Sequence, residues 1–183
     1  MSAVAGAFDD LVLPTTTVQP DWELELAVVI GKGGYRIRRQ DAMTHVAGYT
    51  IANDISARDL IARTDYKMLG TDWLRCKGQP GFLPLGPLLV PARFVPDPHN
   101  LSLRLSVSGR VMQDETTADM LFGIERQIEY ISQYCRLLPG DVICTGSPAG
   151  NGTHYNRFLQ DGDVMEGEIA GLGRQRLVCV AEH

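Results

Sequence analysis

The chain has 183 residues, of which 44% are hydrophobic, and it carries a formal net charge of −5 with a pI near 5.3. This length suits one globular domain with a sizeable core. The acidic balance, and the lack of a patch that combines clustered Lys or Arg with aromatic residues, argue against a nucleic-acid partner. The apolar stretches are too short to span a bilayer, and the N-terminus lacks signal-peptide features. We therefore predict a cytoplasmic protein without a membrane segment.

The first half of the chain predicts two strands, a short helix and a long loop. Residues 1–20 are rich in Thr, Pro and Asp, and we expect them to lie extended along the surface. Residues 22–30 and 45–54 are apolar runs of strand length, and GKGG after the first run is a turn signal. Ser56 is a candidate N-cap for a short helix. Residues 64–87 contain enough Gly and Pro to predict a long ordered loop.

The second half predicts four more strands and the main helix. Residues 101–109 alternate apolar and polar side chains, which indicates a half-buried strand that enters a hairpin at Ser108 and Gly109. TADMLFGIERQIEYISQYC has apolar residues at helical spacing, with Thr116 as a candidate cap. The strand VICTG then opens onto the glycine-rich loop SPAGNG, and two strands follow. This pattern predicts a mixed α/β, β-dominated single domain over residues 21–183.

The cysteines do not form a recognisable framework. Four are scattered along the chain without a CxxC pair: Cys76, Cys135, Cys144 and Cys179. Their spacing favours buried, reduced thiols over disulfides or a zinc site.

Two carboxylates interrupt the apolar run DWELELAVVIG. Glu23 and Glu25 occupy alternate positions, so on a strand they share one face. They could simply point to water. However, the rest of this run is apolar on both faces, which is typical of a strand covered on both sides. The two glutamates would then lie at the rim of a buried sheet, where like charges repel unless a cation neutralises them.

A third carboxylate lies in a similar setting. Asp54 ends the apolar run VAGYTIAN, where it could also form an Asx-turn or cap a helix. Together with Glu23 and Glu25 it would provide the oxygen ligands that suit a hard cation such as Mg²⁺, Mn²⁺ or Ca²⁺. A metal site and the local structural roles both remain open at this point.

Five blocks in order resemble the fumarylacetoacetate hydrolase family. They are DWELELAVVIGK, VAGYTIANDISARD, KGQPGFLPLGPLLV, LLPGDVICTGSPAGNG and FLQDGDVMEGEIAGLG, and together they cover nearly the whole chain from Asp21. The resemblance implies a β-roll fold, a homodimer and a divalent metal, commonly Mg²⁺ or Mn²⁺. The family positions that hold this metal correspond here to Glu23, Glu25 and Asp54.

The resemblance also assigns substrate contacts. Lys77 matches a family lysine that faces substrate and metal, although by itself it reads as a solvated loop lysine. Thr145, Gly146 and Ser147 match a segment that contacts the substrate carboxylate. Small residues there would allow close approach, and hydroxyl and backbone N–H groups can bind an anion. The alternative is a tight turn after a strand.

The family acts on small 2-oxo or 2,4-dioxo acids through a metal-stabilised enolate. We expect C–C bond hydrolysis of an acylpyruvate or fumarylacetoacetate-like substrate. An isomerase or decarboxylase of 2-hydroxyhepta-2,4-diene-1,7-dioate-type diacids is the alternative. A third possibility is a metal-binding core without catalytic activity.

Two departures from the family pattern affect this expectation. Ile61 stands where many members carry a glutamine near the substrate, so we expect one substrate hydrogen bond to be missing. Family members also have an upstream segment, often with a His–Glu base, that we expect this chain to lack. His154, just after the glycine-rich loop, is the histidine that could lie near the site, although loop histidines are often solvated.

Overall fold

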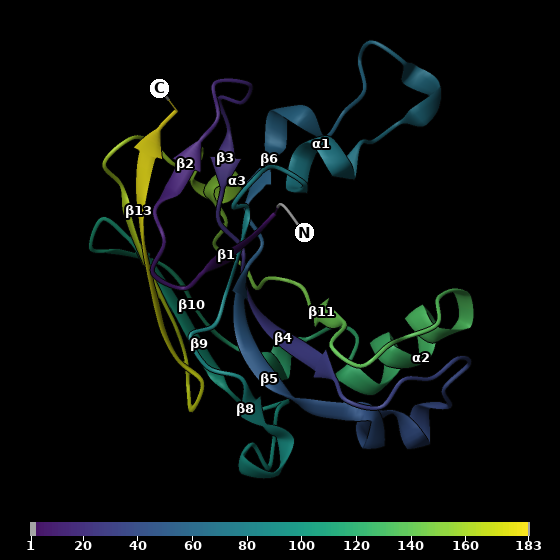
Figure 1. Ribbon diagram of the computed structural model, residues 1–183. Coiled ribbons are helices and arrows are strands. Elements are labelled where there is room, and N and C mark those ends of the chain that lie inside the picture. Colours follow the sequence, from purple (N-terminus) through teal and green to yellow (C-terminus); the bar gives the residue numbers. More distant parts are fainter. Residues whose placement is uncertain (1–2, 183) are drawn as a thin grey trace.

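The computed structural model describes residues 3–182 and arranges the strands in two main sheets and a short ribbon (Figure 1). The first sheet has the order β1-β7-β5-β4-β11, with β8 paired to β5 beside this path. Its strands are β1 (Val4–Gly6), β4 (Leu24–Ile30), β5 (Val46–Asn53), β7 (Leu83–Leu85), β8 (Val90–Pro91) and β11 (Val142–Cys144).

The second sheet has the order β10-β9-β12-β13-β2. Its strands are β2 (Leu11–Leu13), β9 (Ser102–Val107), β10 (Arg110–Thr116), β12 (Val164–Ile169) and β13 (Gly173–Ala181). The ribbon pairs β3 (Pro20–Asp21) with β6 (Ser56–Ala57) in antiparallel fashion. The helices are α1 (Trp73–Lys77), α2 (Ile124–Tyr134) and α3 (Gly152–Tyr155), besides several 3₁₀ turns. The predicted β-dominated mixed fold is confirmed.

Strand β4 runs through the centre of the molecule between β5 and β11 (Figure 1). Every residue of β4 except Val29 is buried, as expected for a strand whose apolar side chains face both ways. On one face it meets the second sheet, where Gly167 of β12 leaves room for Leu24. A Cβ at Gly167 would lie 2.7 Å from a Leu24 methyl carbon, so the close approach of the two sheets depends on this glycine.

The N-terminal segment contributes strands to both sheets. We predicted an extended surface segment over residues 1–20. The structure instead pairs β1 in parallel with β7 and β2 in parallel with β13, and it buries Leu11. Three-residue strands are too short to produce a recognisable alternation, which is why the pattern did not reveal them.

The predicted helix at Ser56 is wrong. Ser56 and Ala57 form β6, and only residues 58–60 turn in a 3₁₀ helix. The Ser56 hydroxyl donates to the carbonyl oxygen of Asp54 rather than capping a helix. Pairing with β3 therefore outweighs the local capping preference.

The predicted long loop contains regular structure. Within residues 64–87 the chain forms α1, whose first turn is capped by Asp72 through a bond from Arg75 N, and then β7. Lys77 is the last residue of α1.

The main helix begins later than predicted. Gly123 is its N-cap with extended backbone angles, so α2 starts at Ile124. Thr116 caps the separate 3₁₀ turn of residues 117–119, and Leu121 is 93% exposed outside the helix. The apolar stripe of α2 consists of Ile124 and Ile128, which are buried, with Ile131 partly buried beside them.

All four cysteines are free, but not all are buried as predicted. Cys76 and Cys179 are buried, Cys144 is partly exposed and Cys135 is exposed. No helix formed by residues 3–182 is long and apolar enough to cross a membrane.

Candidate metal centre

The carboxylates meet where two antiparallel strands begin and end. Glu25 lies in β4, Glu23 directly precedes the first residue of β4, and Asp54 directly follows β5. Because β4 and β5 are antiparallel, with Leu24 opposite Asn53, the start of one strand lies beside the end of the other. The Asp54 amide donates to the Glu23 carbonyl oxygen at 2.8 Å, which fixes this junction.

The three side chains converge. One carboxylate oxygen from each of Glu23, Glu25 and Asp54 lies within 4.8 Å of the others. Burial raises the pKa of Glu25 to about 8; the Gly146 N–H opposes this rise, whereas the charges of Asp54 and Glu23 add to it. Burial likewise raises the pKa of Asp54, against the effect of its bond to Lys77. Burial makes the charged form of these carboxylates unfavourable unless a cation lies beside them. Such oxygen ligands suit a hard divalent cation such as Mg²⁺ or Mn²⁺.

Lys77 contacts two of the three carboxylates. Its Nζ lies 2.7 Å from Glu23 Oε2 and also donates to Asp54 Oδ2. The side chain is 27% exposed, so it borders the cluster from the solvent side. The geometry therefore places Lys77 at the cluster, in contrast to a solvated loop lysine.

The predicted anion-binding loop also borders the cluster. Gly146 N donates to Glu25 Oε2 at 2.8 Å, and its φ of 99° is a conformation that favours glycine. The Thr145 hydroxyl donates to Leu26 O at 2.8 Å, so this hydroxyl is already used within the protein. Gln127 of α2 donates to the Thr145 carbonyl oxygen at 3.1 Å. The loop is therefore anchored, and Ser147 carries its second hydroxyl.

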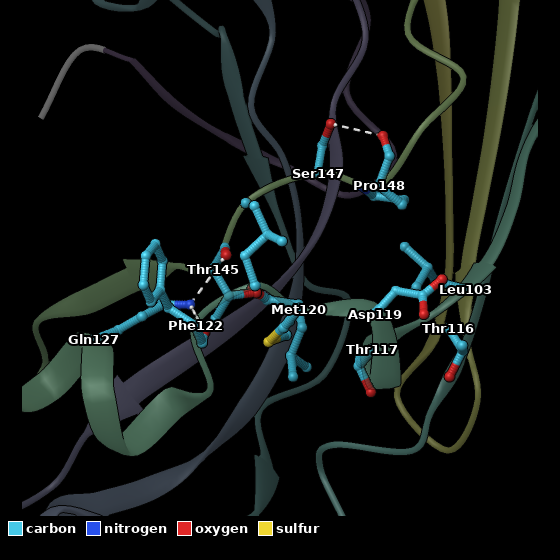
Figure 2. Close-up of a pocket in the computed structure, with 13 residues that line it drawn as sticks. Leu103, Thr116, Thr117, Asp119, Met120, Phe122, Gln127, Thr145, Ser147 and Pro148 are labelled. Carbon is cyan, nitrogen blue, oxygen red and sulfur yellow. Dashed lines mark hydrogen bonds between the residues drawn. The ribbon is translucent and has the colours of Figure 1, made fainter. Parts of the chain in front are cut away.

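A cavity of about 310 Å³ lies against this loop. Figure 2 shows Thr145, Ser147 and Pro148 along one wall, with Asp119 and Leu103 across from them. The same figure shows Gln127 reaching the carbonyl group of Thr145. The cavity is of small-molecule size and borders the loop, but Glu23, Glu25, Asp54 and Lys77 do not line it.

Three polar residues of the centre were not predicted from the sequence. Arg58 donates through Nη2 to Glu23 Oε1 at 2.6 Å and through Nε to Asp21 Oδ2 at 2.8 Å. Asn151 lies beside them in the glycine-rich loop. One signal was available: Asp21 precedes Glu23 by two residues, the same spacing that separates Glu23 from Glu25.

The histidines lie in different settings. His154 lies in α3 with an exposed side chain, and its ring packs edge-on against Tyr155 at 4.7 Å between centroids. Within residues 3–182 it makes no hydrogen bond to the carboxylates. His45 is buried, with Nδ1 2.7 Å from Lys32 O, so this backbone carbonyl orients the ring. His99 accepts a bond from Ile124 N at 3.2 Å and so supports the start of α2.

The chain belongs to the fumarylacetoacetate hydrolase family. Residues 1–180 match the family model "Fumarylacetoacetate (FAA) hydrolase C-terminal". The fold agrees: a probable 2-hydroxyhepta-2,4-diene-1,7-dioate isomerase from Mycobacterium abscessus superposes with a TM-score of 0.91 at 38% identity. That alignment covers 100% of this chain and 68% of the other. The resemblance inferred from the five sequence blocks is confirmed.

The names of two further relatives state different reactions. A mitochondrial oxaloacetate tautomerase of Homo sapiens is 46% identical over 174 residues, which cover 94% of this chain and 54% of that protein. The structure of a fumarylpyruvate hydrolase from Pseudomonas aeruginosa, in complex with Mn²⁺ and pyruvate, has a TM-score of 0.89 at 31% identity. It covers 99% of this chain and 76% of the other. The chain spans about half the length of the tautomerase.

Proposed function

We propose that this chain is the catalytic core of an Mg²⁺- or Mn²⁺-dependent enzyme that enolises small 2-oxo acids. The observation that carries the proposal is the convergence of Glu23, Glu25 and Asp54 around one point, with Lys77 beside them. Ca²⁺ also accepts such oxygen ligands. The Mn²⁺ and pyruvate in the Pseudomonas aeruginosa structure support both the class of metal and the class of substrate.

We assign separate roles to the metal, to Lys77 and to the glycine-rich loop. A bound divalent cation supplies Lewis-acid stabilisation for the charge that develops as the substrate enolises. Burial lowers the pKa of Lys77, but the bonds to Asp54 and Glu23 raise it more, so its net pKa is raised and the ammonium persists. The persistent ammonium of Lys77 can therefore donate a charged hydrogen bond to the enolate oxygen, whereas its raised pKa does not favour transfer of the proton itself. In the loop Thr145–Ser147, the Thr145 hydroxyl and the Gly146 N–H are bonded within the protein, so we assign the contact with the substrate carboxylate to Ser147.

We place tautomerisation of a 2-oxo dicarboxylic acid first among the possible outcomes. Tautomerisation moves a proton between C3 and the 2-oxo oxygen, so it needs a base for the C3 proton but no activated water. Hydrolysis needs a base for its water nucleophile and also an acid for the carbanion leaving group. The 46% identity to an oxaloacetate tautomerase supports this order. C–C hydrolysis, which the sequence alone placed first, follows on the likeness to the fumarylpyruvate hydrolase. Decarboxylation would start from the same enolate chemistry.

One panel experiment tests the proposal. The protein is incubated with Mn²⁺ and oxaloacetate, an acylpyruvate or a hydroxy-diene diacid, beside Glu25→Ala and the distant control Asp163→Asn. We expect the wild type and the control to accelerate the enol–keto interconversion of oxaloacetate. Glu25→Ala should give no acceleration over the rate with Mn²⁺ and no protein. Bound Mn²⁺ without turnover of any substrate would favour a non-catalytic metal-binding core. Turnover that survives Glu25→Ala would contradict the metal site.

Assembly and location remain predictions. We expect a homodimer, which sedimentation velocity would distinguish from a monomer. A cytoplasmic location also stays a prediction, and fractionation of the source cells would test it.

A further inference from the structure

We infer that Asp21 is a positioning residue of the metal centre, which acts through Arg58 on Glu23. This inference rests on the proposed metal site. Asp21 does not belong to the three converging carboxylates, yet it lies only two residues before Glu23, at the end of β3. Its contacts connect Glu23 to the glycine-rich loop.

The Asp21 carboxylate is fully buried and fully occupied. It has no exposed surface, and Oδ1 accepts a bond from Gly152 N at 2.6 Å. Oδ2 accepts from Arg58 Nε at 2.8 Å and from Thr153 N at 3.3 Å. A buried charge held by three donors has one fixed orientation. Asp21 therefore provides a rigid point from which Arg58 can be aimed.

Arg58 passes this orientation to a metal ligand. While Nε contacts Asp21, Nη2 donates to Glu23 Oε1 at 2.6 Å. The guanidinium is planar, so fixing one edge fixes the other. With Oε1 held by Arg58, Glu23 presents Oε2 toward Lys77 and the centre of the cluster. Without Asp21, the Arg58 side chain would lose the contact that selects this rotamer.

The same contacts attach the glycine-rich loop. Trp22 Nε1 donates to Gly150 O at 2.9 Å. When the Asn151 amide is turned so that its oxygen faces donors, it accepts from Arg58 Nη2 at 3.0 Å and from Ser147 Oγ at 3.2 Å. A Cβ at Gly152 would lie 2.7 Å from Asp21 Oδ1 and 2.2 Å from Arg157 O, so no other residue fits there. Asp21 and Arg58 thus hold ligand and loop in one arrangement.

A purely structural role for Asp21 makes a different prediction. If Asp21 only stabilised the fold, its removal would lower the free energy of unfolding and leave the metal affinity of the folded protein unchanged. A positioning role requires that the metal affinity itself falls. Loss of an outer partner of a metal ligand typically weakens metal binding by roughly 10–100-fold.

The test compares Mn²⁺ affinity in Asp21→Asn, Asp163→Asn and the wild type, by calorimetry on folded protein. Asp163 is the matched control, because it is a buried carboxylate that also accepts bonds from an arginine and a backbone N–H, but outside the centre. We expect Asp21→Asn to bind Mn²⁺ about 10–100-fold more weakly, and Asp163→Asn to bind it like the wild type. Thermal unfolding without metal separates the loss of stability from the loss of affinity.

Arg58→Lys gives an independent reading if Asp21→Asn does not fold. Lysine cannot bridge two carboxylates with a planar fork, so we expect a similar loss of Mn²⁺ affinity. Since both residues act in one chain of contacts, the double variant should lose less than the product of the two single losses. Wild-type affinity in Asp21→Asn, or in Arg58→Lys when the first variant fails to fold, would overturn the inference alone. Absence of Mn²⁺ binding by the wild type would instead overturn the proposed function.

Discussion

Two buried carboxylates in this fold have opposite surroundings. Asp163 accepts bonds from Ser108 Oγ at 2.7 Å, Gln160 N at 2.8 Å and Arg157 Nη2 at 2.5 Å. Burial raises its pKa, but these donors lower it more, and the net pKa lies below the ordinary value. Glu25 has a single donor within the described chain, Gly146 N, and two carboxylates nearby, so its pKa rises to about 8.

This is the difference that we expect between a structural carboxylate and the proposed metal ligand. Asp163 is neutralised by the protein, so it stabilises the fold without any external partner. Glu25 is left short of positive charge, which costs stability unless a cation binds. A shortage of donors therefore marks Glu25 as a candidate metal ligand, whereas Glu23 and Asp54 have donors and are candidates because they converge with it.

The largest expected effect tests the cation that already borders the cluster. Lys77→Met should lower turnover by roughly 10²–10³-fold, the range for loss of a hydrogen-bond donor that stabilises a developing oxyanion. Mn²⁺ binding should persist, because Lys77 competes with the metal for Glu23 and Asp54. Steady-state kinetics with calorimetry on the same samples would check this. The exposed Lys32→Met is the control, and equal turnover in both variants would contradict a catalytic role.

Glu25→Gln should separate binding from stability. We expect Mn²⁺ affinity to fall by more than the roughly 100-fold typical of an outer-shell loss. Without metal, the variant should unfold at the same temperature as the wild type or higher, because a buried acid with too few donors has been replaced. Calorimetry and thermal denaturation measure the two effects. A large loss of stability in the metal-free variant would show that Glu25 is structural.

Asp163→Asn should give the reverse result. The variant loses charge-assisted bonds from Arg157, Ser108 and Gln160, and we expect the free energy of unfolding to fall by about 2 kcal/mol. Its Mn²⁺ affinity should stay at the wild-type value. Urea denaturation measures the first quantity; a weakened metal site in this variant would remove the distinction between the two carboxylates.

The smallest expected effect is the pH dependence of the stabilisation that Asp163 contributes. Because the folded pKa of Asp163 is lowered, its stabilisation is fully present above the unfolded pKa of about 4. It is lost as the pH falls through the lower folded pKa. The stability difference between wild type and Asp163→Asn should thus be constant from pH 7 to 5 and shrink below pH 4. Urea titrations across this range would detect a difference that fails to shrink.

The sequence predicted what periodicity and local chemistry encode. The long strands β4, β5 and β9 show apolar runs or clean alternation, and the paired glutamates are visible in the first of them. The prediction started α2 too early because Leu121 fits the helical spacing of apolar residues. In the structure Gly123 caps the start of the helix, so Leu121 lies before it and is exposed to solvent. Local spacing cannot report such a tertiary preference.

The supporting residues of the centre depend on contacts between distant parts of the chain. In the sequence, Arg58 falls in the short helix predicted to start at Ser56. No residue near it in the sequence indicates that it contacts Glu23 or lies beside Asn151. Asp21 pairs with Ser56 across the ribbon and meets Gly152 from the far end of the sequence. These contacts exist only after the sheets form, so residue type and spacing alone could not supply them.

The parallel pairing of β2 with β13 has a consequence for synthesis. Leu11–Leu13 are made early, yet their hydrogen-bonding partners Cys179–Ala181 follow after almost all of the chain between them. A nascent chain on the ribosome therefore carries an open sheet edge until those residues emerge. Such non-local pairing folds slowly and leaves an unpaired edge available for aggregation. Premature stops before β13 should yield insoluble protein, even though every residue proposed for the metal centre has been translated.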